Sequence, residues 1–153
     1  MILIYSQSSK YAIRAFVNLA SQPEGHFAMV KNIAEQEQIP AHFLAKILQQ
    51  IARKGLLKSS KGPTGGFCLK VPASKLKLID IVDAVDGLNS FSSCAGGLPE
   101  CNAATACSLC DRWKPVQSRI MVFLGKTTIA DLVRDARKKA LKPVAKRKVA
   151  RRV

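Results

Sequence analysis

Apolar residues recur at helical spacing near the beginning of the chain and predict a first amphipathic helix. The run follows Ser8 and Ser9, either of which can cap a helix, and it stops at Pro23 and Gly25. Its apolar positions are Tyr11, Ala12, Ala15, Phe16, Leu19 and Ala20. A second, shorter helix follows, and its apolar positions are Val30, Ile33 and Ala34.

A third helix is predicted after a break in the pattern near Gln38 and Ile39, and Pro40 fits its first position. At 100° per residue, one side of this helix is apolar and the opposite side carries only hydrogen-bonding side chains. The apolar side is Leu44, Ile47, Leu48 and Ile51, and the polar side is His42, Lys46, Gln49 and Arg53. Most surface helices have such a polar face, so the helix alone leaves DNA binding and simple solvation both open.

The segment after the third helix predicts a small β-hairpin. Residues 56–58 and 67–69 have the composition of two short strands, and the intervening SSKGPTGG is turn chemistry. Two short helices with a tight turn and a following hairpin form the pattern of a winged helix-turn-helix, although an ordinary hairpin is the alternative. In this interpretation Gly65 and Gly66 let the backbone approach a phosphate and expose N–H donors, and Lys61 supplies charge. The hairpin residues predicted to contact DNA are Ser60, Lys61, Gly65 and Gly66.

A longer helix is predicted beyond residue 111, because apolar residues form one stripe about 100° wide. The stripe consists of Trp113, Val116, Ile120, Phe123, Leu124 and Thr127. This stripe suits either packing against the rest of the chain or pairing with a second copy. Thr128 and Asp131 then have the spacing of a capping-box variant that begins a short helix through Leu132 and Val133.

Length and charge narrow the function classes. The 153 residues are enough for one domain that buries a core without disulfides. The net charge is +15, and nine basic residues without an acidic one lie in residues 137–153. Such an imbalance favours nucleic acid or an anionic membrane surface as a partner, the alternative for residues 137–153 being a solvated, disordered tail. No segment approaches the roughly 18 apolar residues of a membrane span or has a charged leader, which predicts a cytoplasmic protein.

Four of the five cysteines fall within 17 residues, with the spacing C-x6-C-x5-C-x2-C. They are Cys94, Cys101, Cys107 and Cys110. In a reducing compartment, clustered thiols are more often metal ligands or redox groups than structural disulfides. Four thiolates suit a [2Fe–2S] or a [4Fe–4S] cluster, or a structural zinc, although zinc sites more commonly pair two C-x2-C units and only one is present. Redox-active thiols without a metal are the remaining interpretation.

The fifth cysteine and the two histidines give no sign of a catalytic or metal site. Cys68 lies in a predicted strand, far in sequence from the other cysteines, and is interpreted as a small buried hydrophobe. The chain has only two histidines, His26 and His42, and no helix motif that would cradle a phosphate. The sequence therefore predicts no enzyme and no small-molecule substrate.

Several segments together resemble the Rrf2 family of bacterial winged-helix transcription regulators, over about residues 6 to 135. They are KYAIRAFVNLA, IAEQEQIPAHFLAKILQQIARKGLLKSSKGPTGGFCL, IDIVDAVDG, and the cysteine loop followed by DRW. The resemblance implies a homodimer that binds double-stranded operator DNA, with the long helix pairing with its two-fold mate. It also implies an iron–sulfur cluster bound by Cys94, Cys101 and Cys107, with Cys110 at a fourth position where the family often has His.

The expected protein is mostly α: a winged helix-turn-helix domain at 6–90, a cysteine-rich cluster-binding loop at 91–111, a dimerisation helix and a short helix at 112–136, and a basic tail at 137–153. Its expected function is transcription regulation through operator binding modulated by the cluster. The alternatives are a zinc-stapled DNA-binding protein without redox sensing and an iron–sulfur electron carrier.

Overall fold

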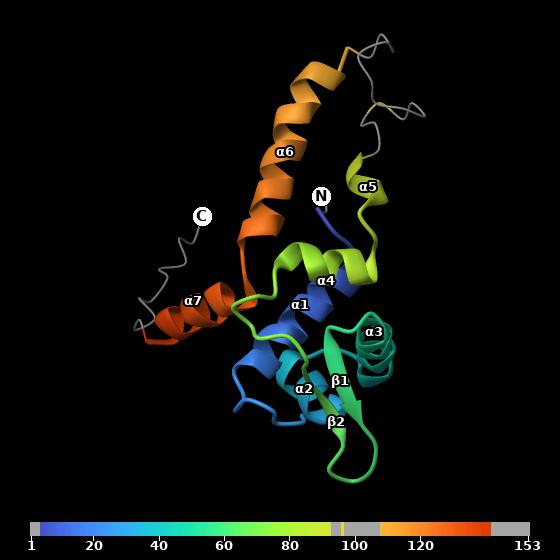
Figure 1. Ribbon diagram of the computed structural model, residues 1–153, viewed down its shortest axis with the longest axis vertical. Coiled ribbons are helices and arrows are strands. Elements are labelled where there is room, and N and C mark those ends of the chain that lie inside the picture. The colour runs from blue at the N-terminus through green and yellow to red at the C-terminus, as the bar shows by residue number, and fades with distance from the viewer. Residues whose placement is uncertain (1–3, 93–95, 97–107, 142–153) are drawn as a thin grey trace, which may run out of the picture.

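The structure is a computed structural model that describes residues 4–92, residue 96 and residues 108–141. Within these residues the chain forms seven helices and one two-stranded antiparallel hairpin, as the mostly α winged-helix prediction requires (Figure 1). The elements are α1 (Gln7–Ala20), α2 (Val30–Glu37), α3 (Ala41–Arg53), β1 (Leu57–Ser60), β2 (Gly66–Leu69), α4 (Leu78–Val85), α5 (Asn89–Ser92), α6 (Cys110–Lys126) and α7 (Ile129–Leu141).

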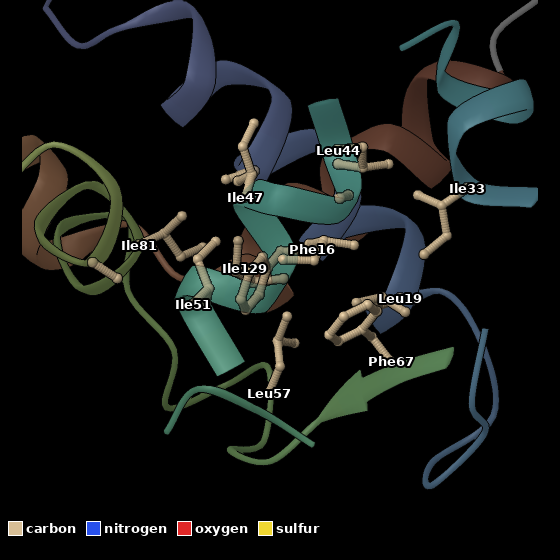
Figure 2. Close-up of a cluster of buried hydrophobic side chains, with 14 of the residues drawn as sticks. Phe16, Leu19, Ile33, Leu44, Ile47, Ile51, Leu57, Phe67, Ile81 and Ile129 are labelled. Carbon is tan, nitrogen blue, oxygen red and sulfur yellow. The ribbon is translucent and has the colours of Figure 1, made fainter. Parts of the chain in front are cut away.

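One hydrophobic core is shared by the four helices α1, α2, α3 and α4, the hairpin and the start of α7 (Figure 2). Leu124 of α6 also lies in this core. Phe16 of α1, Leu44 of α3 and Ile129 of α7 are each fully buried in it. The hairpin contributes Leu57 and Phe67, so the wing is packed onto the helices through both of its strands. The term "body" is used below for these elements, α1–α4, β1, β2 and α7.

The first helix begins differently from the prediction. Its N-cap is Ser6, whose hydroxyl accepts a hydrogen bond from the backbone N–H of Ser9 at 3.1 Å, and neither Ser8 nor Ser9 caps it. Ser9 is instead buried within the first turn, and its hydroxyl donates to Asp86 at 2.8 Å. The hydrogen bonds of Ser6 and Ser9 to Asp86 thus determine which serine caps α1. Pro40 likewise lies one residue earlier than predicted, at the N-cap of α3.

Helix α6 rises out of the body at the end opposite the wing, and α4 is the helix against which it packs (Figure 1). Among its residues only Cys110, at one end, and Leu124, near the other, are buried. Of the predicted apolar stripe, Val116 and Phe123 are exposed, whereas Leu124 is buried and the other three residues are half-buried. Pro115 lies inside this helix and lacks the N–H that would serve the preceding turn.

Helix α7 confirms the predicted cap and corrects a predicted boundary. The backbone N–H of Asp131 donates to the Thr128 hydroxyl at 3.1 Å, and the N–H of Thr128 donates to the Asp131 carboxylate at 3.0 Å. The helix continues to Leu141. Residues 137–141 were expected to belong to a disordered tail, and they are helical instead. Lys138 and Lys139 in its last turn favour this extension, because cations stabilise the C-terminal end of a helix. Residues 142–153 lie outside the described residues.

Candidate DNA interface and cysteine loop

Helix α3 has the two faces that its sequence predicts. Leu44, Leu48 and Ile51 are fully buried, and Ile47 is 5% exposed. The opposite side is exposed, and its four side chains are called the recognition face below: His42, Lys46, Gln49 and Arg53. All four are on the solvent side of the helix, opposite the buried leucines and isoleucines. The helix therefore offers a row of hydrogen-bonding and cationic groups to a partner.

The turn between α2 and α3 fixes how α3 is presented. Gln38 ends α2 in the left-handed region, with φ +52°, and the N–H of Ile39 donates to the Ala34 carbonyl at 2.9 Å. Ile39 is buried, so it anchors the turn in the core. Helix α2 is itself held against α1, because the guanidinium of Arg14 pairs with Glu37 at 3.3 Å. The predicted helix-turn-helix is therefore a packed unit.

The hairpin pairs Leu57 with Leu69 and Ser60 with Gly66, in the order expected for a wing. Its second strand also pairs with the segment before α2, where Ala28 and Phe67 each donate a backbone hydrogen bond to the other at 2.9 Å. The wing is thereby fastened at its base. Ser60, the last residue of β1, and Lys61, in the loop that follows, are exposed.

The two tip glycines serve the protein's own backbone. A Cβ at Gly65 would lie 2.4 Å from the Ser60 carbonyl oxygen, and one at Gly66 would lie 2.1 Å from that of Ala28. The N–H of Gly65 donates to the Gly62 carbonyl at 3.0 Å, which corrects the expectation that this N–H is exposed for DNA. Gly66 also has φ +147°, a conformation that side chains disfavour. The glycine pair therefore permits a close approach, as predicted, but within the fold.

Of the four clustered cysteines, Cys94, Cys101 and Cys107 lie outside the described residues. Cys110 is the first residue of α6 and is 6% exposed, and its N-cap residue Leu109 contributes no side-chain hydrogen bond. One turn later, the indole Nε1 of Trp113 is buried and has no hydrogen-bond partner among the residues that the structure describes. Cys68 is separate from this region and buried in β2, which agrees with its interpretation as a small hydrophobe.

Two polar residues near α3 were not identified from the sequence. The side-chain amide of Gln50 donates to the Ala84 carbonyl at 2.9 Å and to the Val85 carbonyl at 3.2 Å, both at the end of α4. The carboxylate of Asp86 accepts from the N–H and the hydroxyl of Ser6, at 2.9 and 2.5 Å, and from the Ser9 hydroxyl. These partners are 34 to 80 residues apart in sequence, so no local pattern could have indicated them.

Comparisons with known proteins give a consistent result. The model of the Rrf2 family, described as an iron-dependent transcriptional regulator, matches residues 5–135. A relative from Aquifex aeolicus named as an HTH-type transcriptional regulator is 31% identical over 146 residues, covering 94% of this chain and 100% of the relative. The HTH-type transcriptional regulator IscR of Vibrio atlanticus is 27% identical, covering 85% of this chain and 75% of the relative.

Two solved structures share the fold. IscR of T. potens superposes with a TM-score of 0.74 at 23% identity, covering 92% of this chain and 93% of that one. CymR, described as the global cysteine regulator of B. subtilis, superposes with a TM-score of 0.73 at 22% identity, covering 88% of this chain and 98% of that one. These relatives are transcriptional regulators, and none of them is named as an enzyme. No helix within residues 4–92 and 108–141 is long and apolar enough to cross a membrane.

Proposed function

The chain belongs to the Rrf2 family of DNA-binding transcriptional regulators, and we propose that it acts as a homodimer whose paired α3 helices bind operator DNA under the control of an iron–sulfur cluster. The observation that carries the DNA-binding part is the division of α3 into a buried apolar face and an exposed face of His42, Lys46, Gln49 and Arg53. A helix of this kind enters the major groove, where such side chains distinguish the base pairs.

The wing supplies contacts that do not depend on sequence. Ser60 ends β1 and Lys61 follows in the loop, against whose backbone Gly65 packs closely, and a lysine there would neutralise a phosphate. In this proposal the two glycines support DNA binding indirectly, by shaping the loop that carries Lys61. The backbone contact positions the protein on the duplex, and the recognition face selects the sequence.

Alanine substitution on the recognition face tests this assignment. Gln49→Ala and Lys46→Ala should each weaken operator binding by about 1–3 kcal/mol and relax the sequence preference, since each removes a contact to a base edge. Lys61→Ala is the matched comparison: it should weaken operator and random DNA by the same factor and reduce the salt dependence. Competition binding at several salt concentrations measures both. Unchanged operator affinity in the variant with all four recognition-face residues replaced by alanine would place the recognition helix elsewhere.

Dimerisation is proposed to occur through α6. Its exposed apolar residues include Val116 and Phe123, seven positions apart and therefore on one side of the helix. Pairing two such helices about a two-fold axis would cover this stripe and hold two α3 helices about one DNA turn apart, which suits a pseudo-palindromic operator.

The cysteine loop fits an iron–sulfur cluster by its donor chemistry. It offers four thiols within 17 residues, and thiolates are the usual ligands of both [2Fe–2S] and [4Fe–4S] clusters. Cys110 is buried at the start of α6, where the free N–H groups of a helix favour negative charge. The unpartnered indole N–H of Trp113 is a further donor one turn away. When bound, the cluster supplies redox and iron sensitivity that the side chains alone lack.

Family membership by itself does not decide the cofactor, because the CymR relative is described as a cysteine regulator. The assignment is supported by the thiols of this chain, and a structural zinc is the competing occupant. Regulation further requires that the two forms of the dimer hold the cluster with different affinity, since otherwise its gain or loss would shift nothing.

Protein purified without oxygen distinguishes these occupants. We expect a brown protein containing iron and sulfide, whose spectrum assigns the cluster type. Cys107→Ser, like Cys94→Ser and Cys101→Ser, should abolish the colour, because a protonated hydroxyl is a poor substitute for a thiolate. Cys110→His should retain it, and Cys68→Ala is the control that should leave it unchanged. A colourless protein with one zinc per chain would contradict the cluster assignment.

A further inference from the structure

We propose that the end of α4 is the element that positions the recognition helix, acting through two polar residues, Gln50 and Asp86. The name "α4 bracket" is used for Gln50, Asp86 and the groups they bind: the carbonyls of Ala84 and Val85, and the side chains of Ser6 and Ser9. The inference rests on the DNA-binding function proposed above, and it assigns specificity to residues outside the recognition face.

Gln50 completes the hydrogen bonding at the end of α4. The last carbonyls of a helix lack partners within it. Those of Val82 and Asp83 are served by the N–H groups of Asp86 and Gly87, at 2.8 and 3.1 Å. The next two, at Ala84 and Val85, receive the amide group of Gln50, which carries two N–H donors on one nitrogen. The number of donors matches the number of carbonyls, so this contact defines one orientation of the side chain.

The place of Gln50 on α3 makes this contact sensitive to rotation of the helix. It directly follows Gln49, and it lies one turn from both Lys46 and Arg53. Successive residues are about 100° apart, so turning α3 about its axis moves Gln50 and the recognition face together. Base-edge hydrogen bonds tolerate little displacement. Fixing Gln50 on α4 therefore fixes where Gln49 and Arg53 point.

Asp86 is placed against the preference of its own helix. It lies at the C-terminal end of α4, where the helix dipole disfavours a carboxylate. The same carboxylate lies at the N-terminal end of α1, where the dipole favours it, and there it accepts three hydrogen bonds from Ser6 and Ser9. Its role is thus to tie α4 to α1. Gln50 and Asp86 together hold the end of α4 between α3 and α1.

The α4 bracket also lies where the cysteine-loop region joins the body. Gly87, with φ +72°, turns the chain out of α4 into α5, which leads toward Cys94. On its return the chain forms α6, which packs on α4 as well. Both connections of the cysteine loop thus meet the helix whose end holds Gln50. A change in the loop that displaces α4 would therefore alter the orientation of α3.

The test compares operator and random DNA for Gln50→Leu and Asp86→Ala in the full-length protein. We expect operator affinity to fall about fivefold or more, the lower end of typical couplings between sites, while random-DNA affinity and the salt slope remain unchanged. A residue that only supported stability would not change the ratio between the two DNAs, provided that binding is measured well below the thermal transition of each variant.

Matched controls make the same kinds of substitution at sites outside the α4 bracket. Gln7→Leu makes the same change at an exposed site of α1, and Asp83→Ala removes the same charge from an exposed site of α4. Both should keep the wild-type ratio. Asp86→Asn keeps one acceptor oxygen and should give an intermediate ratio, which guards against misfolding of the alanine variant. Wild-type preference in Gln50→Leu, or an equal loss on both DNAs, would overturn the proposal.

A second measurement addresses the cysteine loop. The operator affinities of cluster-loaded and cluster-free protein define a ratio for the wild type, and Gln50→Leu should bring that ratio closer to one, because the α4 bracket no longer transmits the change. A wild-type ratio that Gln50→Leu leaves intact would overturn this coupling. If the wild type binds no cluster, the proposed cofactor fails, whereas the comparison of operator with random DNA still decides the role of Gln50.

Discussion

The body and α6 differ in how far their apolar residues are buried. In the body, each helix and strand covers its apolar face with the other elements, so Phe16, Leu44 and Ile129 are fully buried. In α6, 17 residues long, only Cys110 and Leu124 are buried, and Phe123 is 47% exposed. Helix α6 adds Leu124 to the core of the body, whereas Val116 and Phe123 on the same helix are left exposed in the described residues. In the proposed dimer, stability would depend mainly on the body and assembly on α6.

The largest effect should come from the core of the body. Phe16→Ala should lower the free energy of unfolding by about 3–5 kcal/mol, because it removes a fully buried ring and leaves a cavity. Urea denaturation followed by circular dichroism measures this. A loss below about 1 kcal/mol would show that the core does not carry the stability of the body.

An intermediate effect is expected on α6, where the same chemical change acts on assembly. Phe123→Ala should raise the dimer dissociation constant about tenfold or more, as the loss of a central aromatic contact does at protein interfaces, with little change in the stability of the body. Sedimentation equilibrium measures the dissociation constant. Lys114→Ala, about 160° around the helix from Val116, is the control that should leave dimerisation unchanged. A dimer insensitive to Phe123→Ala would mean that another surface is the interface.

The smallest effect concerns the junction between the two parts, at the start of α7. The backbone N–H of Thr128 and then its hydroxyl, both donating to the Asp131 carboxylate, lower the pKa of Asp131 below its ordinary value. A lowered pKa in the folded state means that the ionised form stabilises the fold above the unfolded pKa, and that this contribution disappears as the pH falls through the folded pKa. The stability difference between wild type and Asp131→Ala should therefore be present at neutral pH and vanish in acid.

Thermal unfolding of both proteins at several pH values measures that difference. Asp135→Ala, which removes a carboxylate from an exposed site of the same helix, should show no such loss in acid. If the difference for Asp131→Ala does not depend on pH, the ionised carboxylate is not what begins α7.

Local patterns predicted those parts of the protein that local forces determine. The two faces of α3 follow from helical periodicity, and the Thr128–Asp131 cap depends on residues three positions apart. The N-cap of α1 was misplaced because three serines stand close together, and a carboxylate 80 residues away selects Ser6. Gln50 was missed for the same reason, since Gln49 and Gln50 differ only in which of them meets the end of α4.

The wing and the cysteine loop show two other limits. A Gly-Gly pair predicts a close backbone approach, but the sequence does not say whether a phosphate or Ala28 occupies the space, and the structure places Ala28 there. The spacing of the cysteines indicates thiolate chemistry, whereas three of the four lie outside the described residues, so the ligand set stays a prediction. Cys110 is the member whose surroundings are known: a buried position at the start of α6.

The shape of α6 gives it a mechanical consequence. At a rise of 1.5 Å per residue, the 14 residues from Leu124 to Cys110 span about 21 Å, so α6 joins the core at Leu124 to the cysteine at its other end as one rigid element. If such an element tilted by about 10° about Leu124, the Cys110 end would move by about 4 Å. Conversely, a displacement at Cys110 would change the angle at which α6 packs against α4. The length of α6 would therefore turn a small change at one end into a larger movement at the other.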